Sequence, residues 1–102
     1  PFMMNEQTAE RVAEVLKAVA HPIRLQIVAL LEHQEMCVGQ IMEALEGKQA
    51  VTSQQLALMR NRGVLARRRE GNRIFYRVAN PNVIKLLHCM YHHCDTNKDA
   101  LN

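Results

Sequence analysis

The stretch "TSQQLALMRNRG", residues 52–63, begins with small polar side chains and ends with two arginines before a glycine. Leu56 and Met59 recur at helical spacing within it, so the sequence predicts an amphipathic helix over residues 49–62. Gly63 would end this helix, because glycine readily adopts the left-handed conformation that follows a helix. The polar first turns suit contact with the base edges of a nucleic acid, and the alternative is a solvated helix with a basic end.

The next stretch, "VLARRREGNRIFYRVA", residues 64–79, predicts two antiparallel strands. Gly71 and Asn72 supply the turn between them. Along the second strand, two sets of side chains alternate: Ile74, Tyr76 and Val78 with Arg73, Phe75 and Arg77. This period of two is typical of a strand with one buried face, and it predicts a β-hairpin with an arginine-rich rim.

The rest of the chain predicts helices over residues 6–20, 22–31, 38–45 and 81–93. Pro22 and Pro81 suit the first turns of their helices, and Gly47 would close the third helix. The second helix is apolar on nearly all sides, so we expect it to be buried centrally. The order of elements, α-α-α-α-β-β-α, predicts a mainly α-helical fold with a small β-hairpin, a winged helix-turn-helix.

A chain of 102 residues with 48% hydrophobic content is long enough for one compact domain. We expect this domain to span residues 5–94, after a disordered or non-native start at residues 1–4 and before a frayed polar tail at residues 95–102. The longest apolar run, residues 27–31, is far shorter than a membrane helix, and no signal peptide opens the chain. The sequence therefore predicts a soluble, cytoplasmic protein without membrane contact.

Positive charge is concentrated in residues 60–77, which hold seven arginines and one glutamate. Residues 1–59 instead hold four basic and seven acidic residues. Arginine suits bidentate contacts to phosphate and to guanine. Because the basic segment directly follows the polar-fronted helix, the sequence predicts contact with double-stranded DNA rather than a merely solvated basic surface.

The predicted DNA contacts divide by position. The first turns of a recognition helix lie in the major groove, so their polar residues are placed to contact bases. Arg60 and Arg62, near the helix end, are better placed for phosphate, and the hairpin residues for the backbone or minor groove. Some hairpin arginines must face the protein because strand neighbours alternate, and Arg24 is expected to be a structural hydrogen-bond donor. The predicted set is Gln49, Thr52, Ser53, Gln54, Gln55, Arg60, Arg62, Arg67, Arg68, Arg69, Asn72 and Arg73.

Metal-ligating side chains gather in "HCMYHHC", residues 88–94. At about 100° per residue, four of them share one helix face: His88, Cys89, His92 and His93. Their spacing is workable for zinc, nickel, cobalt or copper, and the alternative is a polar helix face that binds nothing. Cys94 projects near the apolar face, and Cys37 lies apart, at the start of the third predicted helix. Three cysteines without a CxxC pair favour free thiols over disulfides.

Four stretches in this order resemble the ArsR/SmtB family of small dimeric metal- and stress-responsive repressors. "LKAVAHPIRLQIVALL" is similar to the start of that family's second helix, "EMCVGQIMEAL" to its third, "QAVTSQQLALMRNRGVL" to its recognition helix and "RREGNRIFYRV" to its wing. The resemblance covers residues 12–93 and implies a homodimer, joined through the first and last helices, that releases a palindromic operator when an inducer binds. Lys48 departs from the family pattern at the serine cap of the recognition helix, and Gln55 stands where a histidine is usual.

The metal sites of the family are only partly present. Cys37 matches the first thiol of a Cys-x-Cys pair whose second position is Gly39, and His93 alone matches the site on the last helix. The first hypothesis is that arsenite or a divalent metal ion binds Cys89, with Cys37, Cys94 or the histidines completing the ligands. The second hypothesis is thiol chemistry with a persulfide or an oxidant. It ranks lower because relatives of this kind place one thiol late in the second helix, where this sequence has Ala29. The third hypothesis is that the protein has no inducer. No cofactor is expected to be required for folding.

Other classes of function fit less well. The sequence has no nucleophile motif and no glycine-rich phosphate loop, so an enzyme is not predicted. RNA binding lacks an aromatic platform, since Phe75 and Tyr76 lie inside the predicted hairpin. A winged-helix module for protein–protein interaction is the main alternative, and the salt dependence of binding distinguishes it from a DNA-binding protein.

Overall fold

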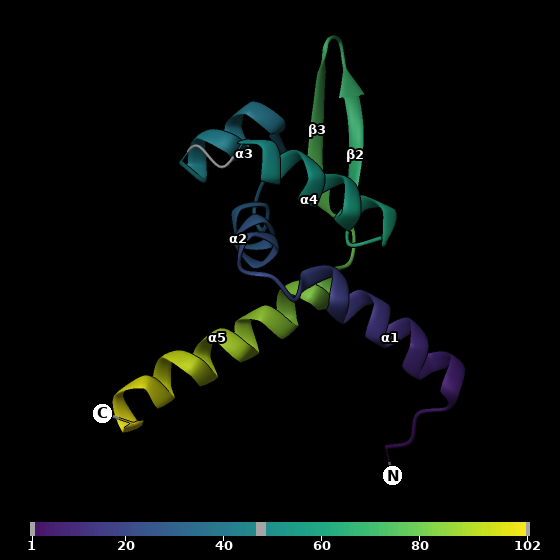
Figure 1. The fold of residues 1–102 in the computed structure, drawn as a ribbon, viewed down its shortest axis with the longest axis vertical. Coiled ribbons are helices and arrows are strands. Elements are labelled where there is room, and N and C mark those ends of the chain that lie inside the picture. Colours follow the sequence, from purple (N-terminus) through teal and green to yellow (C-terminus); the bar gives the residue numbers. More distant parts are fainter. Residues whose placement is uncertain (1, 47–48, 102) are drawn as a thin grey trace.

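The described part of the chain, residues 2–46 and 49–101, folds into five helices and three short strands (Figure 1). The structure is a computed structural model, and it describes the backbone but not the side chains of residues 49–51 and 95–101. In chain order the elements are α1 (Glu6–Val19), α2 (Pro22–Leu30), β1 (Met36–Cys37), α3 (Val38–Ala44), α4 (Gln49–Asn61), β2 (Leu65–Glu70), β3 (Arg73–Val78) and α5 (Pro81–Leu101).

Side-chain caps begin the first two helices. The Asn5 side chain accepts a hydrogen bond from the Thr8 N–H at 2.8 Å, and Nδ1 of His21 accepts one from the Ile23 N–H at 3.1 Å. Both bonds satisfy amides that have no partner inside the helix. Pro22 occupies the first turn of α2, as the sequence predicts, because the N–H that proline lacks would be unpaired there.

α4 carries a buried stripe along one face. Thr52 is 0% exposed, Leu56 1% and Met59 0%, and these residues lie about one turn apart. Gly63 follows the helix with a left-handed φ of 78°, and the Val64 N–H donates to the Met59 carbonyl at 3.0 Å. This glycine-terminated helix end confirms the sequence prediction, and it turns the chain directly into β2.

The hydrophobic core lies where α2, α3, α4 and the sheet meet. Ile27 of α2, Ile41 of α3 and Val64 before β2 are 0% exposed, and Tyr76 of β3 is 6% exposed. Helix α3 and helix α4 pack on each other and α4 also packs on α2 and β2. The helix-turn-helix and the hairpin therefore share one core, which fixes their relative positions.

The sheet has three antiparallel strands in the order β1-β3-β2. β2 and β3 form the predicted hairpin, and Tyr76 of β3 is buried between a half-buried and an exposed neighbour. The third strand, β1, was not predicted, because its two residues carry no periodic signal of their own. Met36 pairs with Tyr76 and Cys37 with Phe75, so β1 exists through its contact with β3.

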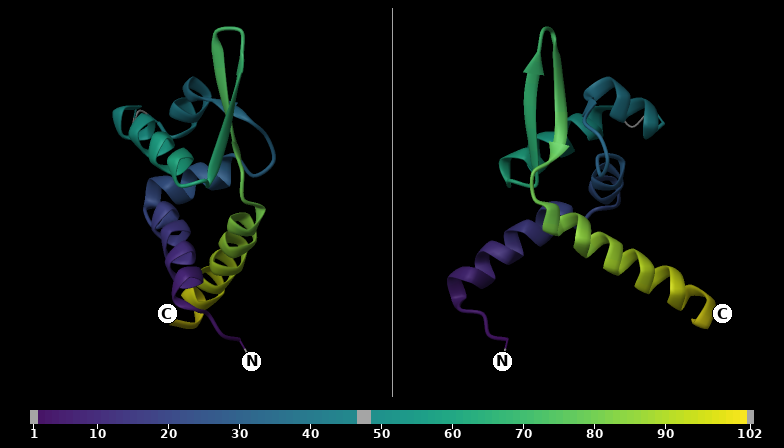
Figure 2. Two further views of the ribbon diagram at one scale, coloured as in Figure 1. Left: turned by 90° about the vertical axis from the view of Figure 1, so that its right-hand side faces the viewer. Right: turned by 180° about the vertical axis from the view of Figure 1, so that it is seen from behind.

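The two ends of the molecule are built differently. The β2–β3 hairpin projects from one end, while α1 and α5 diverge from the opposite end (Figures 1 and 2). α5 packs on α2, and α1 packs on α2 and α4. The hairpin and α3–α4 thus lie on one side of α2, and the two divergent helices extend away on the other.

Two expectations about the helices need correction. α5 continues to Leu101 instead of ending near His93, although neither it nor any other described helix is long and apolar enough to cross a membrane. α2 is not buried all round: Ile27 and Val28 face the core, but Leu25 is 40% exposed. The predicted roles of Gly47 and Lys48 at the helix boundary lie outside the described residues.

Substituting Ile41→Ala is expected to destabilise the fold by about 2–5 kcal/mol, because it leaves a cavity at a fully buried position of α3. Chemical denaturation followed by circular dichroism measures this change. Glu43→Ala, an exposed position on the same helix, is the matched control and should change stability by less than about 0.5 kcal/mol. Equal losses in the two variants would contradict the placement of Ile41 in the core.

Candidate nucleic-acid interface and thiol site

The first turns of α4 present two polar side chains to solvent. Ser53 and Gln54 are exposed. Thr52, predicted to contact DNA, is instead 0% exposed, so that prediction is wrong. The physical reason is that Thr52 lies one turn before Leu56 on the face of α4 that packs into the core. The side chain of Gln49 lies outside the described residues.

Gln55 is engaged inside the protein. The Arg24 Nε donates a hydrogen bond to Gln55 Oε1 at 2.5 Å, and Arg24 Nη1 donates to the Lys17 carbonyl at 2.8 Å. The structural role expected for Arg24 is therefore confirmed. Gln55, predicted to contact bases, is half-buried and connects α4 to α2 through this hydrogen bond.

The two arginines at the end of α4 differ in environment. Arg62, predicted to contact phosphate, forms an ion pair with Glu14 of α1 through its guanidinium group. Arg60 is exposed in the last turn of α4. Of this pair, Arg60 is the side chain available for a phosphate.

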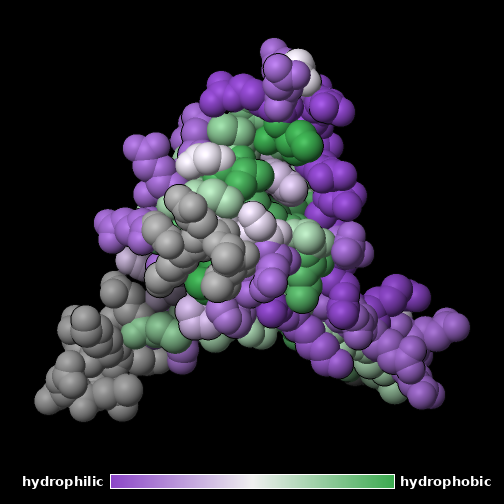
Figure 3. Space-filling view, turned by 45° about the horizontal axis from the view of Figure 1, so that its top comes forward, coloured by the Kyte–Doolittle hydropathy of each residue, from purple (hydrophilic) through white to green (hydrophobic). Residues whose placement is uncertain are grey.

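The hairpin carries its basic residues on both faces. Arg67, Arg69 and Asn72 are exposed, and Arg69 Nε donates to the Gly71 carbonyl at 3.2 Å close to the turn. Figure 3 shows hydrophilic side chains along the edges of the molecule and hydrophobic ones gathered towards the middle of the face it displays. The exposed hairpin residues form the wing of the candidate interface, which we define as Arg67, Arg69 and Asn72.

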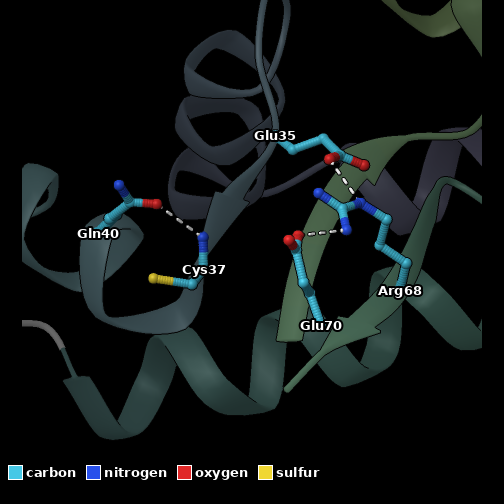
Figure 4. A network of polar contacts seen from close by, with 5 residues as sticks. All are labelled: Glu35, Cys37, Gln40, Arg68 and Glu70. Atoms are coloured by element: carbon cyan, nitrogen blue, oxygen red, sulfur yellow. Dashed lines mark hydrogen bonds and ion pairs between the residues drawn. The ribbon is translucent and has the colours of Figure 1, made fainter. Parts of the chain in front are cut away.

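Arg68 is held by two carboxylates. Its Nε donates to Glu35 Oε1 at 2.8 Å, and its Nη1 donates to Glu70 Oε2 at 2.8 Å (Figure 4). Glu70 and then Glu35 raise the pKa of Arg68 above its ordinary value. The Arg68 guanidinium carbon also lies 4.9 Å from the centre of the Phe75 ring. Arg68, predicted to contact DNA, is thus held in two ion pairs within the chain.

Cys37 combines burial with hydrogen-bond donors. It is 8% exposed and caps α3, where its N–H donates to Gln40 Oε1 at 3.0 Å (Figure 4). The Gln40 backbone N–H lowers the pKa of the Cys37 thiol most, burial opposes this effect, and the positive charge of Arg73 lowers the pKa further. Arg73 Nη2 lies 3.6 Å from Cys37 Sγ. Arg73, predicted to contact DNA, is exposed and also contacts this buried thiol.

The metal-ligating side chains in the described part of α5, up to Cys94, do not gather into one site. His88 contacts Glu32, with Nε2 and Oε1 2.5 Å apart, and its ring centre is 6.2 Å from that of His92. Cys89 and Cys94 are exposed free thiols. Among the described residues, no three His, Cys, Asp or Glu side chains lie close enough together to hold a metal ion. Cys37 lies in the sheet, whereas the other cysteines lie on α5.

Comparisons with known proteins identify the family. A sequence model of the "Bacterial regulatory protein, arsR family" matches residues 21–67, from just before α2 into β2. The biofilm growth-associated repressor of Agrobacterium fabrum is 37% identical over 91 residues, which are 89% of this chain and 78% of that protein. The protein belongs to the ArsR family.

Solved structures agree with this assignment. The transcriptional activator HlyU of Vibrio cholerae is 35% identical over 96 residues, 91% of this chain and 87% of HlyU. Its structure has a TM-score of 0.78 at 31% identity, covering 86% of this chain and 96% of that one. The NMR structure of the homodimeric winged helix-turn-helix domain Mb0332 from Mycobacterium bovis has a TM-score of 0.80 at 31% identity, covering 95% and 93%. The fold of this ArsR-family protein is therefore a winged helix-turn-helix.

An apolar groove of about 720 Å³ lies between α1, α2 and α5 of this ArsR-family protein. Its lining includes Leu16, Leu25, Met90 and Tyr91, which are 40–58% exposed. Cys94 also lines the groove, which agrees with the position predicted for it near the apolar face of the last helix. Contiguous apolar surface of this kind is unfavourable in water and marks a binding surface.

Sequence reasoning missed the acidic partners of the interface. Glu14, Glu32 and Glu35 were counted as charge, but each contacts a predicted functional residue: Arg62, His88 and Arg68. The partners are 48, 56 and 33 residues apart in the chain, so no local pattern connects them. Only the fold brings them together.

Arg73→Leu in this ArsR-family protein is expected to raise the pKa of Cys37, because the substitution removes a positive charge and a hydrogen-bond donor from the thiolate. At a given alkaline pH, the variant will therefore hold less thiolate. NMR titration of the cysteine Cβ carbon, with Cys89 and Cys94 replaced by serine, measures the pKa directly.

Arg77→Leu is the matched control, since Arg77 is exposed on the same strand and does not contribute to the pKa of Cys37. An unchanged pKa in Arg73→Leu, or an equal shift in both variants, would contradict this account of the thiol.

Proposed function

We propose that this protein is a homodimeric transcriptional repressor that binds a palindromic operator and leaves it when an inducer acts at its thiols. The observation that carries the proposal is the pair of exposed side chains, Ser53 and Gln54, on the first turns of α4. They follow the turn of a helix-turn-helix and precede an arginine-rich wing. This is the placement of a recognition helix in the major groove.

Specific and general contacts come from different elements in this proposal. Gln54 can pair bidentately with adenine, and the Ser53 hydroxyl can donate to or accept from several bases. Arg60 and the wing supply positive charge for phosphates and for the minor groove. The first group selects the operator, and the second supplies affinity for DNA of any sequence.

The apolar groove supports a dimer formed through α1 and α5. Its partly exposed leucines and Tyr91 would be removed from water by a second copy of the chain, and the similar domain Mb0332 is homodimeric. A two-fold dimer presents two copies of α4, so its operator would contain two symmetric half-sites.

Repression follows from occupation of promoter DNA. The Agrobacterium relative is named a repressor and HlyU an activator. A protein bound across a promoter blocks access to it, and this mode of repression uses only the DNA-binding surface proposed above. We propose that it acts in this way on bacterial DNA in the cytoplasm.

Induction is proposed to begin at Cys37. Its lowered pKa favours the thiolate, which is the form that binds soft metal ions or arsenite and attacks persulfides. Cys37 belongs to β1, which pairs with β3 of the hairpin, so chemistry at this thiol can disturb the wing. Cys89, Cys94 and the α5 histidines would add ligands from either subunit.

Gln54→Ala is expected to weaken binding to the operator by roughly tenfold or more, because a bidentate base contact contributes about 1–3 kcal/mol of discrimination. Binding to random DNA should stay within about twofold. Fluorescence anisotropy with the DNA upstream of the gene measures both affinities, and Gln26→Ala, exposed on α2, is the matched control. Equal losses on operator and random DNA would mean that Gln54 only positions the backbone.

Cys37→Ser is expected to abolish induced release, because a hydroxyl does not ionise to replace the thiolate. Operator affinity should be unchanged, because serine is similar in size to cysteine. The same anisotropy measurement, with arsenite, zinc, nickel, copper(I) and an organic persulfide added in turn, identifies the inducer. Cys89→Ser, which removes one of the proposed additional ligands on α5, is the comparison variant and should weaken release without abolishing it. Loss of release in Cys89→Ser but not in Cys37→Ser would move the sensor to α5, and operator binding that no compound reverses would contradict thiol-based induction.

A further inference from the structure

One face of the sheet carries a row of contacts that crosses all three strands. Cys37 of β1 pairs with Phe75 of β3, and Phe75 pairs with Arg68 of β2. Residues that pair directly in this way present their side chains on the same face. Two guanidinium groups lie near the Phe75 ring, with the Arg68 carbon 4.9 Å and the Arg73 carbon 5.7 Å from its centre.

Arg68 reaches across this row to a different part of the chain. β2 and β1 are the two edges of the sheet, with β3 between them. Arg68 lies on β2, yet its Nε bonds at 2.8 Å to Glu35, the residue directly before β1 (Figure 4). Since β1 leads into α3, this contact joins the outer strand of the hairpin to the start of the helix-turn-helix.

The β1–β3 pairing is short, and it joins the hairpin to the residues before α3 in addition to the packing of α4 on β2. Only Met36 and Cys37 pair with β3, whereas all six residues of β2 pair with it. A two-residue strand supplies little resistance to bending of the hairpin. The Arg68–Glu35 ion pair adds a further connection, which runs from β2 at one edge of the sheet to the residue before β1 at the other.

We propose that Arg68 is a positioning residue, which sets the angle of the wing on DNA through Glu35 while Arg67 and Arg69 contact the DNA. This inference rests on the proposed function and assigns separate roles to three consecutive arginines. Arg68 donates hydrogen bonds from Nε and Nη1 to the carboxylates of Glu35 and Glu70. Arg67 and Arg69 lie on the opposite face of β2. To bind phosphate through Nε or Nη1, Arg68 would have to give up a charge-assisted hydrogen bond to a carboxylate.

Glu35→Gln separates the two roles by the sign of its effect. If Arg68 positions the wing, the loss of its partner weakens operator binding, by about three- to tenfold for a dimer with two copies of the pair. If Arg68 binds phosphate, Glu35→Gln frees its guanidinium and removes a nearby negative charge, so binding becomes tighter. Fluorescence anisotropy with operator DNA measures the change.

Glu70→Gln is the matched control. It removes the same charge from the same arginine, but Glu70 lies on the same strand as Arg68 and connects it to nothing else. Operator affinity in Glu70→Gln should be unchanged or slightly tighter. The difference between the two variants therefore isolates the connection to the helix-turn-helix from the charge effect, and thermal unfolding of both checks that they are folded.

Two further readouts test a positioning role. Arg68→Gln should weaken binding without changing the slope of log affinity against log salt, whereas a lost phosphate ligand would lower that slope by about 0.9 per subunit. The Nε–H NMR signal of Arg68 should stay in place when operator is added to the wild-type protein and should move in Glu35→Gln.

Tighter or unchanged binding by Glu35→Gln, or a lower salt slope in Arg68→Gln, would overturn the positioning role while the proposed repressor function stands. Failure of the wild-type protein to prefer operator over random DNA would overturn both.

Discussion

The buried stripe of α4 is the constraint on which the candidate interface depends. Thr52, Leu56 and Met59 pack into the core, and a helix with one buried face must turn its other face outward. That outward face carries Ser53 and Gln54 in the first turns. The same helix ends in the left-handed glycine turn that leads into β2, so its packing also positions the hairpin. Hydrophobic burial thus determines where the polar chemistry lies.

Periodicity in the sequence predicted the helices, the hairpin and the turn glycines, because each depends on residues close together in the chain. It assigned the wrong side to Thr52, since a small polar residue at the edge of an apolar stripe does not reveal on which side it lies. It also missed β1, whose two residues form a strand only by pairing with β3. The ion pairs of Arg62 and Arg68 were beyond its reach, because they join residues 48 and 33 positions apart.

The arginines of residues 60–77 do not act as one uniform positive field. Arg62 forms an ion pair with Glu14, and Arg68 forms ion pairs with Glu35 and Glu70. Arg73 contacts the thiol of Cys37. Arg60 and the wing remain exposed at the candidate interface. The number of phosphates that the protein neutralises should therefore be smaller than its count of arginines suggests. Some of the arginines therefore stabilise contacts within the fold, and the others are left to contact phosphates.

The arrangement in space separates the proposed DNA contact from the proposed self-association. α4 and the hairpin lie at one end of the molecule, and α1 and α5 extend towards the other (Figures 1 and 2). The apolar groove is lined by residues of α1, α2 and α5. The most direct test is a titration of the isotope-labelled protein with operator DNA, followed by backbone amide NMR. The account predicts the largest shift changes at Ser53, Gln54 and the wing, with the groove unaffected. Changes concentrated in the groove, or none on α4, would contradict it.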